Sequence, residues 1–121
     1  MTNLDNGMLQ IKRVYEEPSS SDGVRILVDR VLPRGVSKER AHVERWEKEL
    51  GPSTELRKWF GHEPPRFDEF AKRYRVELKA QLPLIQEIRA LAETGTVTLV
   101  YSARDEEHNQ AVVLASVISG S

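Results

Sequence analysis

The most informative absence from this sequence is cysteine, since none occurs among its 121 residues. A disulfide framework, a thiolate nucleophile and a zinc site with sulfur ligands are therefore excluded. The three histidines lack the spacing of zinc ligands, and no glycine-rich phosphate loop of either common type occurs. We expect neither a metal nor a cofactor.

Excess charge of either sign is also missing. The chain has 18 basic and 19 acidic residues, which gives a net charge of -1. A protein whose main partner is nucleic acid or a membrane surface usually carries a basic excess, so neither partner is expected. No run of about 18 apolar residues occurs, and Met1–Gly7 has neither the basic nor the apolar stretch of a signal peptide. We expect a cytoplasmic protein, with the oligomeric state left open and a homodimer as one option.

The apolar patterning predicts a single α/β domain over residues 9–121, preceded by a disordered leader over residues 1–8. Strands are predicted at 9–15, near a sheet edge, and at 24–32. A further strand at Thr96–Tyr101 is β-branched, aromatic and nearly all apolar, which is typical of a central strand. These strands predict a small, mostly parallel sheet of three to four strands flanked by helices.

Helices are predicted between the second and third of these strands and after the last one. Ser37 is a good N-cap for a helix over 38–50, and Gly51-Pro52 would end it. A short helical segment contains Leu56, Trp59 and Phe60, and a longer one contains Phe67, Phe70, Tyr74 and Leu78. After a break at Pro83, a third segment contains Ile85, Ile88 and Leu91. A final helix is predicted over residues 110–118.

The first candidate site is the polar run Ser102–Asn109, which follows the predicted central strand and opens the last helix. Sites in parallel sheets form at the carboxyl ends of strands, and the N–H groups of a helix N-terminus favour anions. The run contains Arg104, Asp105 and His108. The alternative is that its acidic residues only complement the helix N-terminus, with His108 and Asn109 solvated.

The second candidate is the segment from Asp29 to Gly35, in which two charges interrupt an apolar strand. Arg30 and Arg34 could clamp an oxyanion, because guanidinium groups match carboxylate and phosphate. The alternative is a structural ion pair, since a buried charge needs a partner. Asp29 and Arg30 would then pair with each other, or with Asp105 and Arg104 on the neighbouring strand.

The third candidate is His62, which follows Trp59, Phe60 and Gly61. An aromatic pair beside a histidine could roof a pocket, and the imidazole could titrate near neutral pH. The alternative is a core aromatic cluster with a histidine at the surface.

Four segments closely resemble the YeaO-like bacterial proteins, a family catalogued as a domain of unknown function. They are Lys12–Tyr15, Leu27–Gly35, Glu55–His62 and Tyr101–Asn109, and the resemblance extends over about residues 9–118. It implies membership of that family and supplies no established activity.

The resemblance bears on one residue. Longer relatives carry a cysteine where Ser102 stands and a Cys-His-Arg further on, so any thiol chemistry in the relatives is absent here. Ser102 could act as a nucleophile only with a base to activate it, and His108 is the available base. Whether the two side chains meet is a question of geometry.

The first hypothesis is a domain that binds a small anion, phosphate or carboxylate, with or without catalysis. Arg30 and Arg34 would hold the anion, with Arg104 and His62 as further binding candidates. Asp105, His108 and Asn109 would orient the ligand or transfer protons, and Ser102 is a weaker catalytic candidate. Whether the protein is an enzyme stays open.

Two alternatives belong to other classes. One is a non-catalytic structural or interaction protein whose polar strand ends only stabilise the fold. The other is a nucleic-acid-associated factor that uses a local set of basic residues, namely Lys12, Arg13, Arg34, Lys38 and Arg40.

Overall fold

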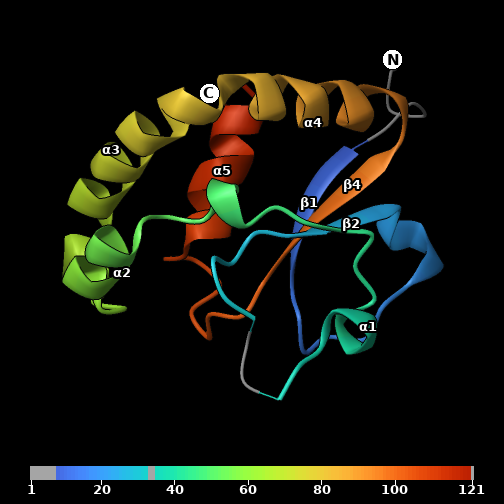
Figure 1. Ribbon diagram of the computed structural model, residues 1–121, viewed down its shortest axis with the longest axis horizontal. Coiled ribbons are helices and arrows are strands. Elements are labelled where there is room, and N and C mark those ends of the chain that lie inside the picture. Colours follow the sequence, from blue (N-terminus) through green and yellow to red (C-terminus); the bar gives the residue numbers. More distant parts are fainter. Residues whose placement is uncertain (1–7, 33–34, 121) are drawn as a thin grey trace.

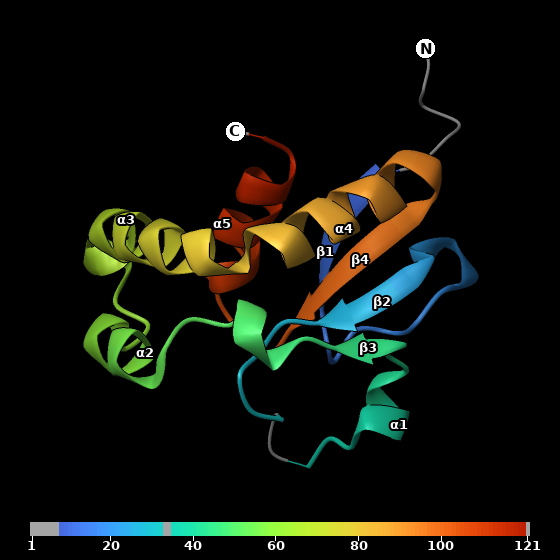
Figure 2. The ribbon, with the colours of Figure 1, turned by 45° about the horizontal axis from the view of Figure 1, so that its top comes forward.

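The sheet of this protein has four strands, as seen in a computed structural model that describes residues 8–32 and 35–120. The strands are β1 (Met8–Arg13), β2 (Val24–Leu27), β3 (Arg45–Trp46) and β4 (Thr96–Tyr101). Their order is β1-β4-β2-β3 and every neighbouring pair is parallel (Figure 2). The predicted α/β class is confirmed, with Thr96–Tyr101 between two neighbours as expected.

The helices α4 (Leu82–Thr94) and α5 (Gln110–Ile118) pack on one face of the sheet (Figure 1). Two further helices, α2 (Thr54–Phe60) and α3 (Phe67–Leu78), extend this helical layer beyond the strands. Phe70, Tyr74 and Leu78 are buried along α3 and belong to the main core cluster, as the helical spacing predicts. Within the described residues, no helix is both long enough and apolar enough to cross a membrane.

The opposite face of the sheet is covered by loops and by the short helix α1 (Lys38–Ala41) (Figure 2). Its small apolar cluster consists of Val14, Leu27, Ala41 and Val100, all buried. The two faces therefore differ: the helical face holds the main apolar core, and the loop face holds a smaller one.

The predicted helix over 38–50 is wrong. α1 ends at Ala41, where His42 takes a left-handed conformation with φ 54°, and the chain then extends into β3. Arg45 and Trp46 pair with Ile26 and Leu27 of β2. The aromatic Trp46 suits a strand, and pairing with the sheet edge satisfies backbone groups that a local helix would have satisfied.

The predicted strand over 24–32 is shorter than expected, since β2 ends at Leu27. Val28 still donates a backbone hydrogen bond to Val100, but Asp29 and Arg30 lie beyond the strand and Val31 is 53% exposed. The two charges thus belong to the carboxyl edge of the sheet. Of the predicted leader over 1–8, Met8 is the first residue of β1 and the remainder lies outside the described residues.

Candidate functional site

A cavity of about 290 Å³ lies at the carboxyl ends of β2 and β4. The chain leaves β2 toward the loop face and leaves β4 toward the helical face, which is the arrangement that opens a crevice in parallel sheets. The cavity is lined by Asp29, Arg30, Val31, Pro52, Arg57, Lys58, Phe60, His62, Phe70, Ser102, Ala103, Asn109 and Gln110. Its volume is near the lower end of the range of small-molecule sites, roughly 300–1,000 Å³.

Asp29 lines this cavity and is only 7% exposed. The hydroxyl of Ser102 donates to its Oδ2 at 2.6 Å, and the amide nitrogen of Gln110 donates to its Oδ1. Burial raises the pKa of Asp29 above its ordinary value, against the opposing effects of these two side-chain donors, the backbone N–H of Ser102 and the charge of Arg57. Asp29 thus keeps its hydrogen bonds but has only neutral groups as direct donors.

Arg30 lies beside Asp29 in sequence but is bound elsewhere. Its Nε donates to the carbonyl of Pro52 at 2.9 Å and its Nη2 to that of Gly51 at 2.8 Å. In the described part of the chain, no ion pair joins Asp29 or Arg30 to each other, to Arg104 or to Asp105, so the pairing considered from the sequence is not formed. The guanidinium instead fixes the start of α2 against the cavity wall.

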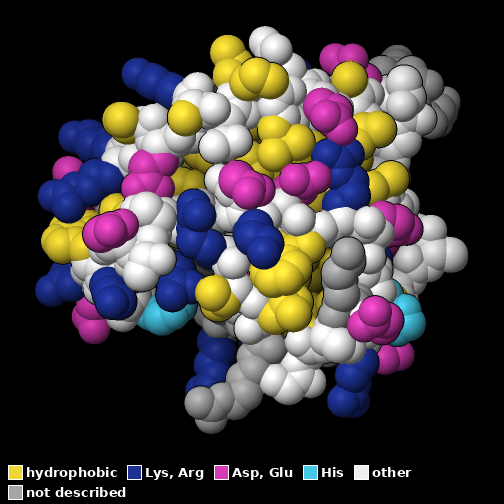
Figure 3. All heavy atoms as spheres, viewed as in Figure 1, with side chains coloured by type: hydrophobic (Ala, Val, Ile, Leu, Met, Phe, Trp, Pro, Cys, Tyr) yellow, Lys and Arg dark blue, Asp and Glu magenta, His cyan; other side chains and the backbone are white. Residues whose placement is uncertain are grey.

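Two cations that sequence reasoning missed stand at the mouth of the cavity. Arg57 and Lys58 are exposed on the last turn of α2, and His62 follows them. No carboxylate among the described residues forms a salt bridge with Arg57 or Lys58. Figure 3 shows many Lys and Arg side chains around α2 and α3, interspersed with acidic ones. The mouth therefore carries two cations that form no salt bridge within the described residues, although the charge of Arg57 also acts on Asp29.

Asp105 and His108 form a separate pair outside the cavity lining. Oδ2 of Asp105 lies 2.9 Å from Nδ1 of His108, and the ring of Phe67 meets the imidazole edge-on with centroids 5.2 Å apart. Oδ1 of Asp105 accepts the backbone N–H groups of Glu107 and His108. The Glu107 N–H, then His108, hold the pKa of Asp105 below its ordinary value. Arg104 is exposed nearby.

The predicted partnership of Ser102 with His108 has no hydrogen bond to support it within the described residues. The Ser102 hydroxyl is directed to Asp29, and Nδ1 of His108 is directed to Asp105. The structure therefore brings Ser102 to the cavity bonded to Asp29 and not to His108, the base that the sequence offered.

Asn109 lines the cavity, yet its amide serves the start of α5. Its Oδ1 accepts the N–H of Val112 at 3.0 Å, its Nδ2 donates to the carbonyl of Asp105 at 2.8 Å, and the residue is 1% exposed. This is an N-cap, which stabilises the helix.

Arg34 lies outside the described residues. Across the described residues, no group of three or more His, Asp or Glu side chains could hold a metal ion.

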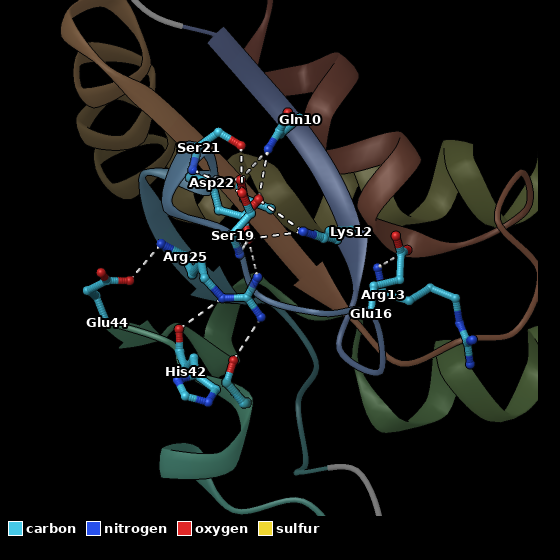
Figure 4. Close-up of polar contacts among 12 residues, drawn as sticks. Gln10, Lys12, Arg13, Glu16, Ser19, Ser21, Asp22, Arg25, His42 and Glu44 are labelled. Atoms are coloured by element: carbon cyan, nitrogen blue, oxygen red, sulfur yellow. Dashed lines mark hydrogen bonds and ion pairs between the residues drawn. The ribbon is translucent and has the colours of Figure 1, made fainter.

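A second buried aspartate, Asp22, lies at the other end of β2, before its first residue (Figure 4). It is 2% exposed, and its carboxylate is bound by Arg25 at 2.7 Å and by Lys12 at 3.1 Å. Gln10 and the backbone of Ser19 add further donors. Burial opposes ionisation of Asp22, but the Ser19 N–H, Lys12 and Arg25 together hold its pKa below the ordinary value.

The same contacts bear on the nucleic-acid alternative. Of its five basic residues, Lys12 binds Asp22, and Arg13 donates to the carbonyls of Ala103 and Ser102. Arg40 is exposed, whereas Arg34 and the side chain of Lys38 lie outside the described part of the chain. Two of the five cations are thus engaged within the fold.

Taken together, fold and site define a small α/β domain with a cation-rimmed cavity at the carboxyl edge of a parallel sheet. The chain belongs to the family described as the inactive DUF488-N3 subclade, which matches residues 8–121. The resemblance to YeaO-like proteins is confirmed.

Relatives of similar length support this assignment. The chain is 43% identical over 112 residues to an uncharacterised protein of Mycobacterium tuberculosis H37Rv and to one of Mycobacterium bovis, covering 93% of this chain and 94% of each relative. It is 42% identical over 107 residues to the uncharacterised protein YeaO of Escherichia coli K12, covering 88% of this chain and 93% of YeaO. No solved structure matches the chain.

Proposed function

We propose that this protein binds a small anion, a phosphate or carboxylate, in the cavity at the ends of β2 and β4, without transforming it. The observation that carries the proposal is the cavity mouth, where Arg57 and Lys58 have no carboxylate partner among the described residues. Exposed cations at the rim of a concave site attract anions and supply charge-assisted hydrogen bonds to their oxygens.

Binding without chemistry is favoured by two observations. The family is described as inactive. In addition, the Ser102 hydroxyl donates to a carboxylate rather than to a histidine, so the serine–histidine pair of an activated nucleophile is not formed within the described residues. Arg30 then has a positioning role: it holds the segment before α2 and so sets where Arg57 and Lys58 stand.

Titration calorimetry with inorganic phosphate at low ionic strength tests this proposal. We expect saturable binding to one site in the wild type and at least a tenfold loss of affinity, about 1.4 kcal/mol, in the double variant Arg57→Ala/Lys58→Ala. Both side chains are exposed on a helix, where alanine is well tolerated.

Lys72→Ala is the matched control, because Lys72 is an exposed cation of α3 that does not line the cavity. Its phosphate affinity should equal that of the wild type. Equal phosphate affinities in the double variant and the wild type would contradict the proposal. So would the absence of binding both for phosphate and for acetate, which serves as the carboxylate probe.

A further inference from the structure

The two buried aspartates of this fold have opposite electrostatic surroundings. Asp22 is 2% exposed and is bound by two cationic side chains, Arg25 and Lys12. Asp29 is 7% exposed and forms no salt bridge within the described residues. Asp22 precedes β2 and Asp29 follows it. The presence or absence of a cationic partner therefore differs between the two ends of one strand.

The carboxylate without a cation is the one that faces a cavity. Asp29 lines it, whereas the carboxylate of Asp22 is enclosed by Arg25, Lys12 and the backbone of Ser19. Ser102 and Gln110 each donate to one oxygen of Asp29, and each carboxylate oxygen can accept more than one hydrogen bond. The two donors orient the carboxylate and leave acceptor capacity for a ligand.

The charges of the cavity are separated by depth. Asp29 is buried, and Arg57 and Lys58 are exposed at the mouth, so a ligand that enters meets positive charge first and negative charge further in. Phe60 and Phe70, stacked with ring centroids 4.4 Å apart, supply an apolar wall along the same space.

We infer that the ligand of this cavity is a small zwitterion, with a protonated amine bound by Asp29, an anionic group held by Arg57 and Lys58, and a short apolar linker between them. This inference rests on the proposed anion binding and adds the cationic half of the ligand. A ligand ammonium gives Asp29 the direct cationic partner that Arg25 and Lys12 give Asp22, and a buried carboxylate is costly without one. Asp29 would be a binding residue that also weakens, by repulsion, the binding of anions that lack an ammonium group.

A matched pair of ligands tests the inference: ethyl phosphate and phosphoethanolamine, which differ by the terminal ammonium. In calorimetry at pH 7 we expect phosphoethanolamine to bind the wild type at least tenfold more tightly than ethyl phosphate. In Asp29→Asn the affinities for phosphoethanolamine and ethyl phosphate should agree within about twofold, because the negative charge that binds the ammonium is gone. Propionate and β-alanine make the same comparison for a carboxylate ligand.

Each outcome separates the two proposals. Equal binding of both members of each pair to the wild type overturns the zwitterion and leaves anion binding intact. A preference for the amine that survives in Asp29→Asn overturns the role of Asp29. Failure of all four ligands to bind overturns both proposals. The wild-type comparison decides the inference even where the variant does not fold. Glu17→Gln, which removes an exposed negative charge outside the cavity lining, should retain the preference.

Discussion

Asp22 and Asp29 lie at the two ends of one strand, are buried to a similar extent, and differ in what satisfies them. The carboxylate of Asp22 is enclosed by Arg25, Lys12 and the backbone of Ser19, and its pKa is lowered. The carboxylate of Asp29 has two neutral donors and a cavity in front of it, and its pKa is raised. The difference is that the first carboxylate has direct cationic partners within the fold, whereas the second has none among the described residues.

The largest expected effect is at the closed cluster. Asp22→Asn should lower the free energy of unfolding by about 3 kcal/mol, because it leaves the buried guanidinium of Arg25 without its counter-charge. Urea unfolding followed by circular dichroism measures this, with the exposed Glu17→Gln as a control for loss of a negative charge. A loss below about 1 kcal/mol, the value of an exposed pair, would show that the cluster is not what stabilises this end of the sheet.

Arg30→Ala comes next. It removes two charge-assisted hydrogen bonds, to the carbonyls of Gly51 and Pro52, and should cost about 2 kcal/mol of stability. Arg104→Ala, an exposed arginine at the same edge of the sheet, should change the unfolding free energy by less than about 0.5 kcal/mol. If the two variants are equally stable, Arg30 has no positioning role.

Ser102→Ala should have a smaller effect, about 1 kcal/mol, because Asp29 loses one of two donors and retains Gln110. The exposed Ser20→Ala is the control and should leave the unfolding free energy unchanged. Loss of the hydroxyl should also raise the pKa of Asp29 further, since the hydrogen bond favours the ionised form. A fall in that pKa, measured by carboxyl NMR titration, would contradict this description of the cavity.

The smallest expected effect is that of Asp29→Asn, which should raise the free energy of unfolding rather than lower it. A folded-state pKa above the ordinary 3.8 means that Asp29 contributes stability below that pH and loses it as pH rises through the folded value. Asp29→Asn should therefore be more stable than the wild type at pH 7, and this gain should shrink toward pH 3. The lowered pKa of Asp22 predicts the reverse: its contribution is present above pH 3.8 and is lost on acidification. Urea unfolding from pH 3 to 7 measures the stability of Asp29→Asn and of Asp22→Asn relative to the wild type. The comparison would be contradicted if this difference in unfolding free energy changed with pH in the same way for both variants.

The sequence predicts the parts of this fold that depend on local patterns. β4 and the buried stripe of α3 follow from β-branched content and from helical spacing, and both lie where expected. β3 could not be predicted in this way, because residues 45–46 are extended only through pairing with Ile26 and Leu27 of a distant strand. A tertiary contact overrides the local helical pattern there.

The candidate site was predicted only in part, for a similar reason. Its position at the carboxyl ends of two strands and the presence of Arg30, His62, Ser102 and Asn109 follow from the sequence. Arg57 and Lys58 resemble any solvated helix surface, and only the fold brings the end of α2 to the cavity mouth. Asp22 likewise appears as a turn residue after three serines, because its partners come from other segments.

The most direct test of the central claim is to locate the bound anion by two-dimensional NMR while inorganic phosphate is titrated into the ¹⁵N-labelled protein. The account predicts saturable shifts of the backbone amides at 29–30, 57–58, 102–103 and 110, with the amides of Asp22 and Arg25 unchanged. Shifts that centre on Asp22 and Arg25, or that never saturate at any one group of residues, would contradict it.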